Sequence, residues 1–303
     1  MKLRTSYAIL GGALLALPQL LHAQPTAHYV PGIEGLKAAS LPPPGIYLRD
    51  YNVFYYSKTL HDSHGNSIGG ADPEAFIYAN VPRLLWITDM VLLGGSIGFD
   101  ALLPLQYTDL SINTPGGHYS DSTFGIGDVF GEVTWSAHTA HWDLALGYGI
   151  WGPTGDSSSK EPTTEAGLGY WGQMITAGAT FYPDTAKKWS ISALNRYEIN
   201  GEKDGTDMSP GDAWTIEGGI SRALSPTVDL GVVGYYQMQA TKASGNTTGY
   251  FSASRDEVAG IGPEISVFYP RQTLGWTLRY LYEFMAEDRL QGHTIVLTLT
   301  KRF

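Results

Sequence analysis

Residues 293–303 read HTIVLTLTKRF, and polar and apolar side chains alternate along this stretch. The side chains at 295, 297, 299 and 303 are apolar and fall on one face. Those at 294, 298, 300 and 302 are polar and fall on the other, with Val296 as the apolar exception. Because successive side chains of a strand point to opposite faces, the pattern predicts a β-strand with one apolar and one polar side.

The same two-residue period recurs upstream, clearly in 142–150 and 273–283 and less strictly in 228–233. Turn-forming residues separate these segments. We expect the chain to form about twelve strands, at residues 45–59, 72–88, 91–112, 122–137, 141–152, 165–182, 187–199, 212–223, 227–240, 256–269, 273–284 and 291–303.

The composition suits strands that are apolar on one side only. Charged residues make up 16% of the chain, against about 25% in typical soluble domains, yet the mean hydropathy is only -0.11. In a membrane barrel one face of each strand meets lipid and the other meets water, so the average conceals the apolar face. There is no cysteine, which excludes disulfides and cysteine-based metal sites. The net charge of -10 argues against a nucleic-acid partner.

The connections between the expected strands support a membrane barrel. The second, fourth, sixth, eighth and tenth are short, whereas the odd-numbered ones are expected to be longer and polar. Outer-membrane barrels sort their connections in this way, with short periplasmic turns and longer outer loops. We therefore predict an all-β fold, a transmembrane antiparallel β-barrel of about 12 strands over residues 45–303, in the bacterial outer membrane.

Two segments precede the predicted barrel. Residues 1–23 read as a signal peptide, because Lys2 and Arg4 precede an apolar run that ends near Ala23. Residues 24–44 show no clear periodicity and end in the run Pro42–Pro44, which cannot join a hydrogen-bonded ladder. We expect this second segment to be either a periplasmic tail or a plug that folds back into the barrel.

Three motifs carry a resemblance to a known family. They are His28–Gly32 continuing through Leu36–Tyr47, the GIGDV sequence at 125–129, and the GIWGPTG sequence at 149–155. With the closing strand, they resemble the outer-membrane transporter family named for the meta-pathway of phenol degradation. The resemblance implies a channel or transporter for passive uptake of small, aromatic or hydrophobic compounds. It supplies no catalytic residue that matches a position in this chain.

The predicted membrane barrel also implies binding partners. The final strand, ending at Phe303, resembles the signal that the barrel-assembly machinery reads in outer-membrane proteins. The other expected partners are outer-membrane lipid and a small-molecule permeant. No cofactor and no metal site is predicted, since the eight histidines show no paired ligand spacing.

Charged residues within the strands should point into the lumen, because an Arg or Lys at the bilayer midplane costs about 2–4 kcal/mol. They either line a solute path and select among permeants or form a neutralising ladder that braces the wall. Asp128, between Gly127 and Val129, could accept backbone or Arg hydrogen bonds. The lumen residues predicted in this way are Asp128, Glu132, Arg196, Glu198, Glu217, Arg279, Glu283 and Arg302.

The sequence also allows two other functions. An outer-membrane hydrolase would need a serine, a histidine and a carboxylate in reach of one another. The nearest sequences are His61-Asp62-Ser63 and His118-Tyr119-Ser120, both in expected loops. The other alternative is a structural barrel with no transport role. The favoured prediction is a channel with no enzymatic step.

Overall fold

The computed structural model describes residues 27–157, 164–245 and 255–303, and their regular secondary structure consists of strands. The strands are β1 (Gly45–Leu60), β2 (Asp72–Leu92), β3 (Gly95–Leu102), β4 (Leu105–Thr114), β5 (Gly117–Ile126), β6 (Val129–His138), β7 (Trp142–Gly152), β8 (Gly172–Phe181), β9 (Trp189–Asn200), β10 (Ala213–Ser225), β11 (Val228–Gln239), β12 (Glu257–Tyr269), β13 (Leu274–Glu287) and β14 (Leu290–Arg302).

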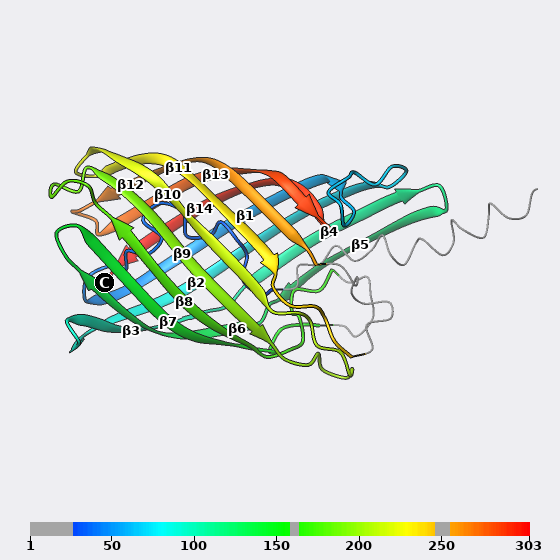
Figure 1. Cartoon of the computed structure of the whole chain (residues 1–303), viewed down its shortest axis with the longest axis horizontal. Helices are drawn as coiled ribbons and strands as arrows, with labels where there is room; N and C mark the ends of the chain where they lie inside the picture. The colour runs from blue at the N-terminus through cyan, green and yellow to red at the C-terminus, as the bar shows by residue number, and fades with distance from the viewer. Residues whose placement is uncertain (1–26, 158–163, 246–254) are drawn as a thin grey trace, which may run out of the picture.

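The strands form a closed antiparallel barrel (Figure 1). β1 closes it by pairing with β14 on one side and with β2 on the other. β2 pairs with β3 through 83–92 and with β4 through 72–80, so β3 and β4 are two halves of one interrupted strand. β5 and β6 are likewise two halves, paired with β4 and β3. Fourteen segments thus make twelve barrel strands, which confirms the predicted fold class.

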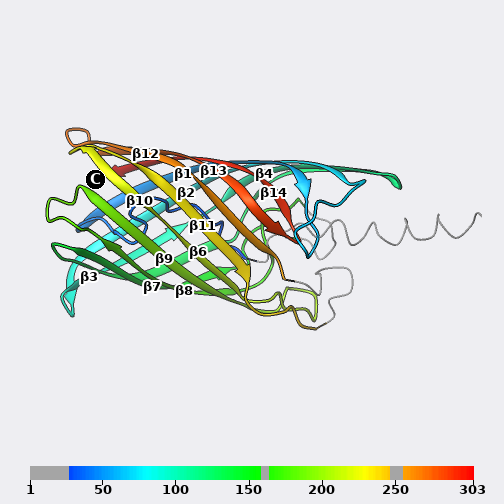
Figure 2. The ribbon, with the colours of Figure 1, turned by 45° about the horizontal axis from the view of Figure 1, so that its top comes forward.

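One of the two interruptions contains a proline, and the other lies beside it. Leu103 and Pro104 separate β3 from β4, and Gly127 and Asp128 separate β5 from β6. Proline has no N–H to donate to a neighbouring strand, and the two breaks contact each other because Gly127 N donates to Pro104 O at 2.8 Å. Beyond them, β4 and β5 continue as a hairpin that projects past the rest of the barrel (Figures 1 and 2). Among the described strands, β5 alone is paired on one edge only.

The outer face of the barrel is apolar. Leu146, Tyr148 and Ile150 are 53%, 48% and 43% exposed, and the residues between them point inward. In β14 the predicted alternation is also confirmed, and Val296 lies inside the barrel. Exposed aromatic side chains near the strand ends, such as Trp142 and Tyr269, match the aromatic girdles of membrane barrels. Within the described ranges, no helix is long and apolar enough to cross a membrane.

The strict alternation of short and long connections is wrong at two positions. The connections after β4 and β13 were expected to be long, but they are two-residue turns at 115–116 and 288–289. In both cases the flanking strands continue further than predicted, and Asp288 adopts a left-handed turn conformation with φ of 57°. β8 also starts later than predicted, at Gly172, since residues 165–171 belong to the preceding loop.

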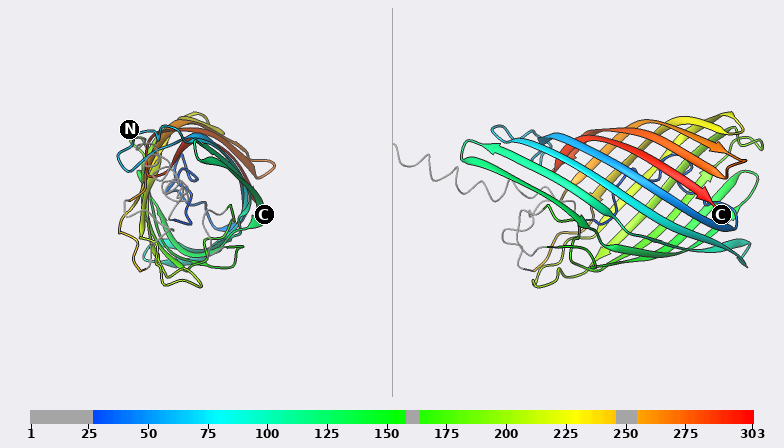
Figure 3. Two further views of the ribbon diagram at one scale, coloured as in Figure 1. Left: turned by 90° about the vertical axis from the view of Figure 1, so that its right-hand side faces the viewer. Right: turned by 180° about the vertical axis from the view of Figure 1, so that it is seen from behind.

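Apart from the two-residue turns after β4 and β13, the connections at one end of the barrel are short and those at the other end are long, and we name the two ends accordingly. The short-turn end carries the turns at 93–94, 139–141, 182–188, 226–227 and 270–273. The long-loop end carries the loops at 61–71 and 201–212 and the described residues 240–245 and 255–256. Phe303 lies at the short-turn end (Figure 3). In outer-membrane barrels the end with short turns faces the periplasm.

Residues 27–44, the lumen segment, lie inside the barrel (Figure 3). The segment starts at the long-loop end, where His28 contacts Glu198 near the end of β9, and descends to the short-turn end, where Pro44 leads into β1. Of the predicted segment 24–44, these are the described residues. The predicted signal peptide, residues 1–23, lies outside the described residues and stays a prediction.

Candidate functional site

At the long-loop end, which we call the upper end, the lumen segment is attached through a buried histidine that lies between two carboxylates. Nδ1 of His28 lies 2.5 Å from Oε1 of Glu198, and Nε2 lies 3.3 Å from Oδ2 of Asp128. The ring stacks on Trp151 at 5.1 Å and meets Tyr170 edge-on at 4.6 Å. Burial alone lowers the pKa of His28, but the two carboxylates outweigh this effect and raise it to about 9. His28 is therefore a cation at neutral pH, held in the lumen by two anions of the wall.

Asp128 also fixes the loop that follows β7. Its Oδ1 accepts a hydrogen bond from Gly155 N at 2.9 Å, and its Oδ2 accepts one from Leu168 N at 2.7 Å. The carboxylate thus joins three parts of the chain: the β5–β6 break, the β7–β8 loop and the lumen segment.

Tyr29 continues the attachment below His28. Its hydroxyl donates to Glu217, its carbonyl accepts from Gln237 at 2.9 Å, and its ring lies 4.1 Å from the Arg196 guanidinium. Each of these wall residues comes from a different strand, β9, β10 or β11. The segment is therefore held by side chains around the wall as well as at its end.

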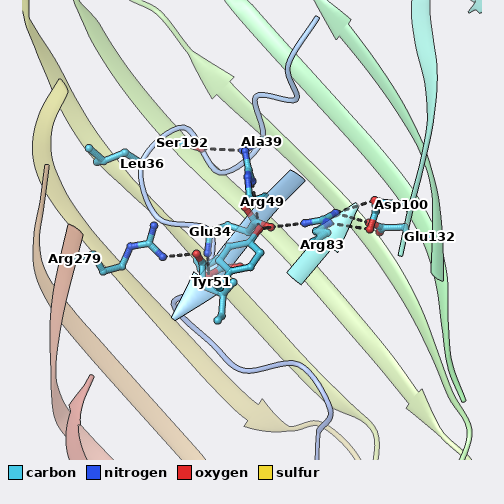
Figure 4. Close-up of polar contacts among 12 residues, drawn as sticks. Glu34, Leu36, Ala39, Arg49, Tyr51, Arg83, Asp100, Glu132, Ser192 and Arg279 are labelled. Atoms are coloured by element: carbon cyan, nitrogen blue, oxygen red, sulfur yellow. Dashed lines mark hydrogen bonds and ion pairs between the residues drawn. The ribbon is translucent and has the colours of Figure 1, made fainter. Parts of the chain in front are cut away.

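Glu34 forms the centre of the site (Figure 4). Its carboxylate lies 2.9 Å from Arg49 Nη1, 2.7 Å from Arg83 Nη1 and 3.6 Å from Arg196 Nη2, and it accepts a hydrogen bond from the Tyr51 hydroxyl at 3.2 Å. Although burial raises the pKa of Glu34, the surrounding arginines outweigh this and lower it to about 2. Arg49 and Arg83 face each other across β1 and β2, and such a like-charge pair is unfavourable unless an anion neutralises it.

A second arginine contact lies beside this cluster. Arg279 Nη1 donates to the carbonyls of Gly32 and Ile33, and Arg279 Nε donates to Glu264 at 2.7 Å. Gly35 allows this close approach. Its φ is +62°, and a Cβ placed on it would lie 1.9 Å from Glu264 Oε2.

The structure places the eight predicted lumen residues as follows. Seven are buried inside the barrel, and Arg302 lies at the short-turn rim, opposite the inward-facing Tyr47. All except Glu132 and Glu283 contact the lumen segment directly, Arg302 through the Pro44 carbonyl at 3.0 Å. Glu132 instead contacts Arg83 and Thr176, and Glu283 accepts from Tyr55 and Tyr235.

Sequence reasoning missed Glu34 and its partners Arg49 and Arg83, although it included Arg196. Arg49 and Arg83 were available as inward charges, but the facing of the first strand could not be assigned from its mixed pattern. Asp100 pairs with Arg83 at 2.8 Å, and the alternation of inward and outward side chains along β3 places it inside the barrel. Once β1 and β2 are paired in register, the facing arginines are the signal that an acidic partner is needed.

Two cavities lie in the lumen, one on each side of the Glu34 cluster. The upper cavity, toward the long-loop end, has a volume of about 270 Å³ and mostly apolar walls. The lower cavity has a volume of about 280 Å³ and more polar walls. Both are bounded by Ile33, Glu34, Tyr51, Arg83 and Arg196. The lumen segment and its arginine partners therefore separate the two cavities.

The sequences considered for a hydrolase do not form a catalytic arrangement. Ser63 Oγ lies 3.4 Å from His64 Nδ1 on an exposed loop, but the Asp62 carboxylate accepts from the backbone amides of 64 and 66. His118 contacts Asn113, on the exposed β4–β5 hairpin. Among the residues that the structure describes, no group of three or more His, Asp or Glu side chains could hold a metal ion.

Comparisons with known proteins agree with this fold. The profile of a family described as "Putative MetA-pathway of phenol degradation" matches residues 57–299. The COG4313 outer membrane channel from Pseudomonas putida F1 is similar in structure, with a TM-score of 0.74, 14% identity, and coverage of 91% of this chain and 100% of that one.

The transport unit of the autotransporter AIDA-I from Escherichia coli is similar at a TM-score of 0.52 and 11% identity, covering 98% and 100% of the two chains. Comparison with curated proteins returned no significant match. The fold is that of bacterial outer-membrane barrels, and the apolar exterior is the surface that this location requires.

Proposed function

From the premise that the chain belongs to the family described as "Putative MetA-pathway of phenol degradation", we propose that it is an outer-membrane channel for passive uptake of small, aromatic or hydrophobic compounds. The lumen segment controls passage, and no enzymatic step is involved. The assembly machinery recognises the final strand, ending at Phe303.

The upper cavity is the observation that carries this proposal. Its walls include Val53, Ile77, Phe130, Trp151 and Met174. A dry cavity of about 150 Å³ lined by such side chains binds benzene, so a cavity of about 270 Å³ is large enough for a single aromatic ring with a short substituent. Water-filled channels have polar linings, and the apolar walls favour a hydrophobic permeant over a sugar or an ion.

The lumen segment supports gated passage over an open pore. It lies between the upper and lower cavities and is held by ion pairs at His28 and Glu34. A permeant that enters the upper cavity can reach the lower one only if this segment moves. The ion pairs connect groups on the segment to groups on the wall, so they can break and re-form without unfolding the barrel.

The test is to fill the upper cavity. Ala79 lines it on β2, and Ala79→Phe places a ring where the permeant would bind. Uptake of radiolabelled toluene or 3-phenylpropionate, whichever the wild-type protein admits, should fall in intact cells that express this variant to that of cells without the protein. Ala101→Phe is the matched control, because Ala101 is exposed on the outer face of β3. Unchanged uptake of both compounds with Ala79→Phe would remove the proposed role of the cavity.

A further inference from the structure

Most of the upper cavity wall is apolar, with charged groups at His28, Asp128, Glu283 and Arg289, and its floor is a cluster of several charges. Arg83, Arg196, Tyr51 and the Glu34 carboxylate form it. Three guanidinium groups, those of Arg49, Arg83 and Arg196, point at this one carboxylate. Arg83 and Arg196 border the upper cavity, and Arg49 reaches the same carboxylate from the lower cavity. A mostly apolar chamber that ends at such a cluster of arginines has the shape and charge of a site for an amphiphilic anion.

The anion that now occupies the arginines belongs to the lumen segment and not to the wall. Arg83 also has a partner on the wall, because its guanidinium donates hydrogen bonds of 2.8 and 2.9 Å to the Asp100 carboxylate. These bonds do not involve the lumen segment. In contrast, within the described residues the carboxylate that pairs with Arg49 is Glu34, and Arg49 also donates to the Tyr51 hydroxyl. Withdrawal of Glu34 would therefore leave Arg49 without its carboxylate partner.

Arg196 shows the same dependence. It is 5% exposed, and its wall partner Glu217 lies at the long distance of 3.4 Å. Within the described residues, its buried Nε has no hydrogen-bond partner. A buried guanidinium donor without an acceptor is costly, and an oxygen from a ligand in the cavity could supply the acceptor.

We propose that Arg49, Arg83 and Arg196, with the Tyr51 hydroxyl, bind the carboxylate of the permeant, and that Glu34 is the internal competitor for this site. The permeant class is then a small apolar monocarboxylate, with its aromatic or aliphatic part in the upper cavity. Glu34 is tethered beside the arginines, so its effective concentration is high, and it closes the path when no permeant is present. This inference rests on the proposed function and specifies its substrate class.

The first test uses calorimetric titration of the purified full-length protein with 3-phenylpropionate and its neutral amide. Glu34→Gln keeps the size of the side chain and removes the competing charge. It should bind the acid at least about tenfold more tightly than the wild type does, because the charge-assisted contacts are freed, while affinity for the amide stays the same. Glu74→Gln is the control, since Glu74 is exposed and pairs with Lys58 away from the lumen. Adding Arg49→Gln to Glu34→Gln should abolish the preference for the acid.

The second test keeps Glu34 in place. The chain has no cysteine, so Ser40→Cys creates a single thiol on the lumen segment. Excess 3-phenylpropionate should displace the segment and raise the rate of maleimide labelling several-fold, whereas the amide should not.

The outcomes separate this inference from the proposed function. The carboxylate site is disproved if Glu34→Gln binds the acid and the amide with equal affinity. It is also disproved if 3-phenylpropionate does not change the rate of maleimide labelling of Ser40→Cys. In that case toluene uptake that depends on Ala79 would still support a hydrophobic channel. If uptake of both toluene and 3-phenylpropionate is also insensitive to Ala79→Phe, both proposals are wrong.

Discussion

At the scale of single residues, Gly35 makes the close contact between the lumen segment and the wall possible. Gly35 has a left-handed φ of +62°, and the side chains of Glu264 and Arg279 fill the position that a Cβ at this residue would take. Gly35→Ala should therefore displace the segment locally, because the new methyl group meets a buried ion pair and the backbone becomes strained. We expect ion conductance in planar bilayers to rise several-fold while the barrel stays folded.

Gly205→Ala is the matched control for this prediction. Gly205 has a similar φ of +72°, but no atom lies within 4 Å of the position of its Cβ. Equal conductance of the two variants would mean that backbone strain alone, and not the contact with Glu264 and Arg279, explains any effect.

At the scale of strands and loops, Asp128 joins the break between β5 and β6 to the loop after β7. It accepts hydrogen bonds from the amides of Gly155 and Leu168. A buried amide that loses its acceptor costs about 1–3 kcal/mol, so Asp128→Ala should weaken the attachment of this loop. The expected result is faster hydrogen exchange in the peptides that contain 155 and 168, measured by mass spectrometry.

Asp109→Ala provides the comparison, because Asp109 is exposed on the outer face of β4. Exchange should then be unchanged at 155 and 168. If Asp128→Ala also leaves exchange at these positions unchanged, the loop is held by other contacts, such as the hydrogen bond from Asp156 N to Ile126 O.

The elements also show how far the sequence could predict this molecule. The two-residue period along 142–150 and 293–303 was sufficient for strand type and facing, because a lipid-exposed wall imposes that period directly. The breaks at Pro104 and at Gly127 were not predicted, since each half-strand keeps the same period and only the change of partner reveals the gap.

Some wall residues of the site could be predicted from the sequence, but their contacts with the lumen segment could not. Inward facing of Arg196, Glu198, Glu217 and Arg279 followed from the cost of placing charge in lipid. Their contacts with 27–44 could not follow from it, because that segment has no periodicity and its position depends on pairing partners far along the chain. Residue pairing across the barrel, and not local pattern, brings Glu34 to the arginines.

At the scale of the whole molecule, two oppositely charged groups make the attachment of the lumen segment depend on pH. His28 has its pKa raised from 6.5 to about 9 when docked, so its contribution is fully present below pH 6.5 and is lost as pH rises through 9. Glu34 has its pKa lowered from 4.5 to about 2, so its contribution is present above pH 4.5 and is lost as pH falls through 2. Docking should therefore be strongest between pH 4.5 and 6.5.

The alkaline limb of this profile gives a measurable prediction. A rise of the His28 pKa from 6.5 to 9 corresponds to about 3 kcal/mol of docking free energy. The groups that face His28 are Asp128, Glu198 and Tyr170, so deprotonation of the imidazole leaves the two carboxylates without their cation. A nitroxide attached at Ser40→Cys should show its smallest mobile fraction between pH 4.5 and 6.5 and a growing one as pH approaches 9.

His28→Gln isolates the cause, because glutamine keeps a polar side chain and cannot carry the charge. In this variant the mobile fraction should be higher at neutral pH and constant between pH 6.5 and 9, whereas the loss at acidic pH, which belongs to Glu34, should persist. A pH profile that is the same with and without His28 would assign the alkaline release to another group. A wild-type segment that stays immobile through pH 9 would show that the contacts of Tyr29 and Glu34 hold it without the imidazolium.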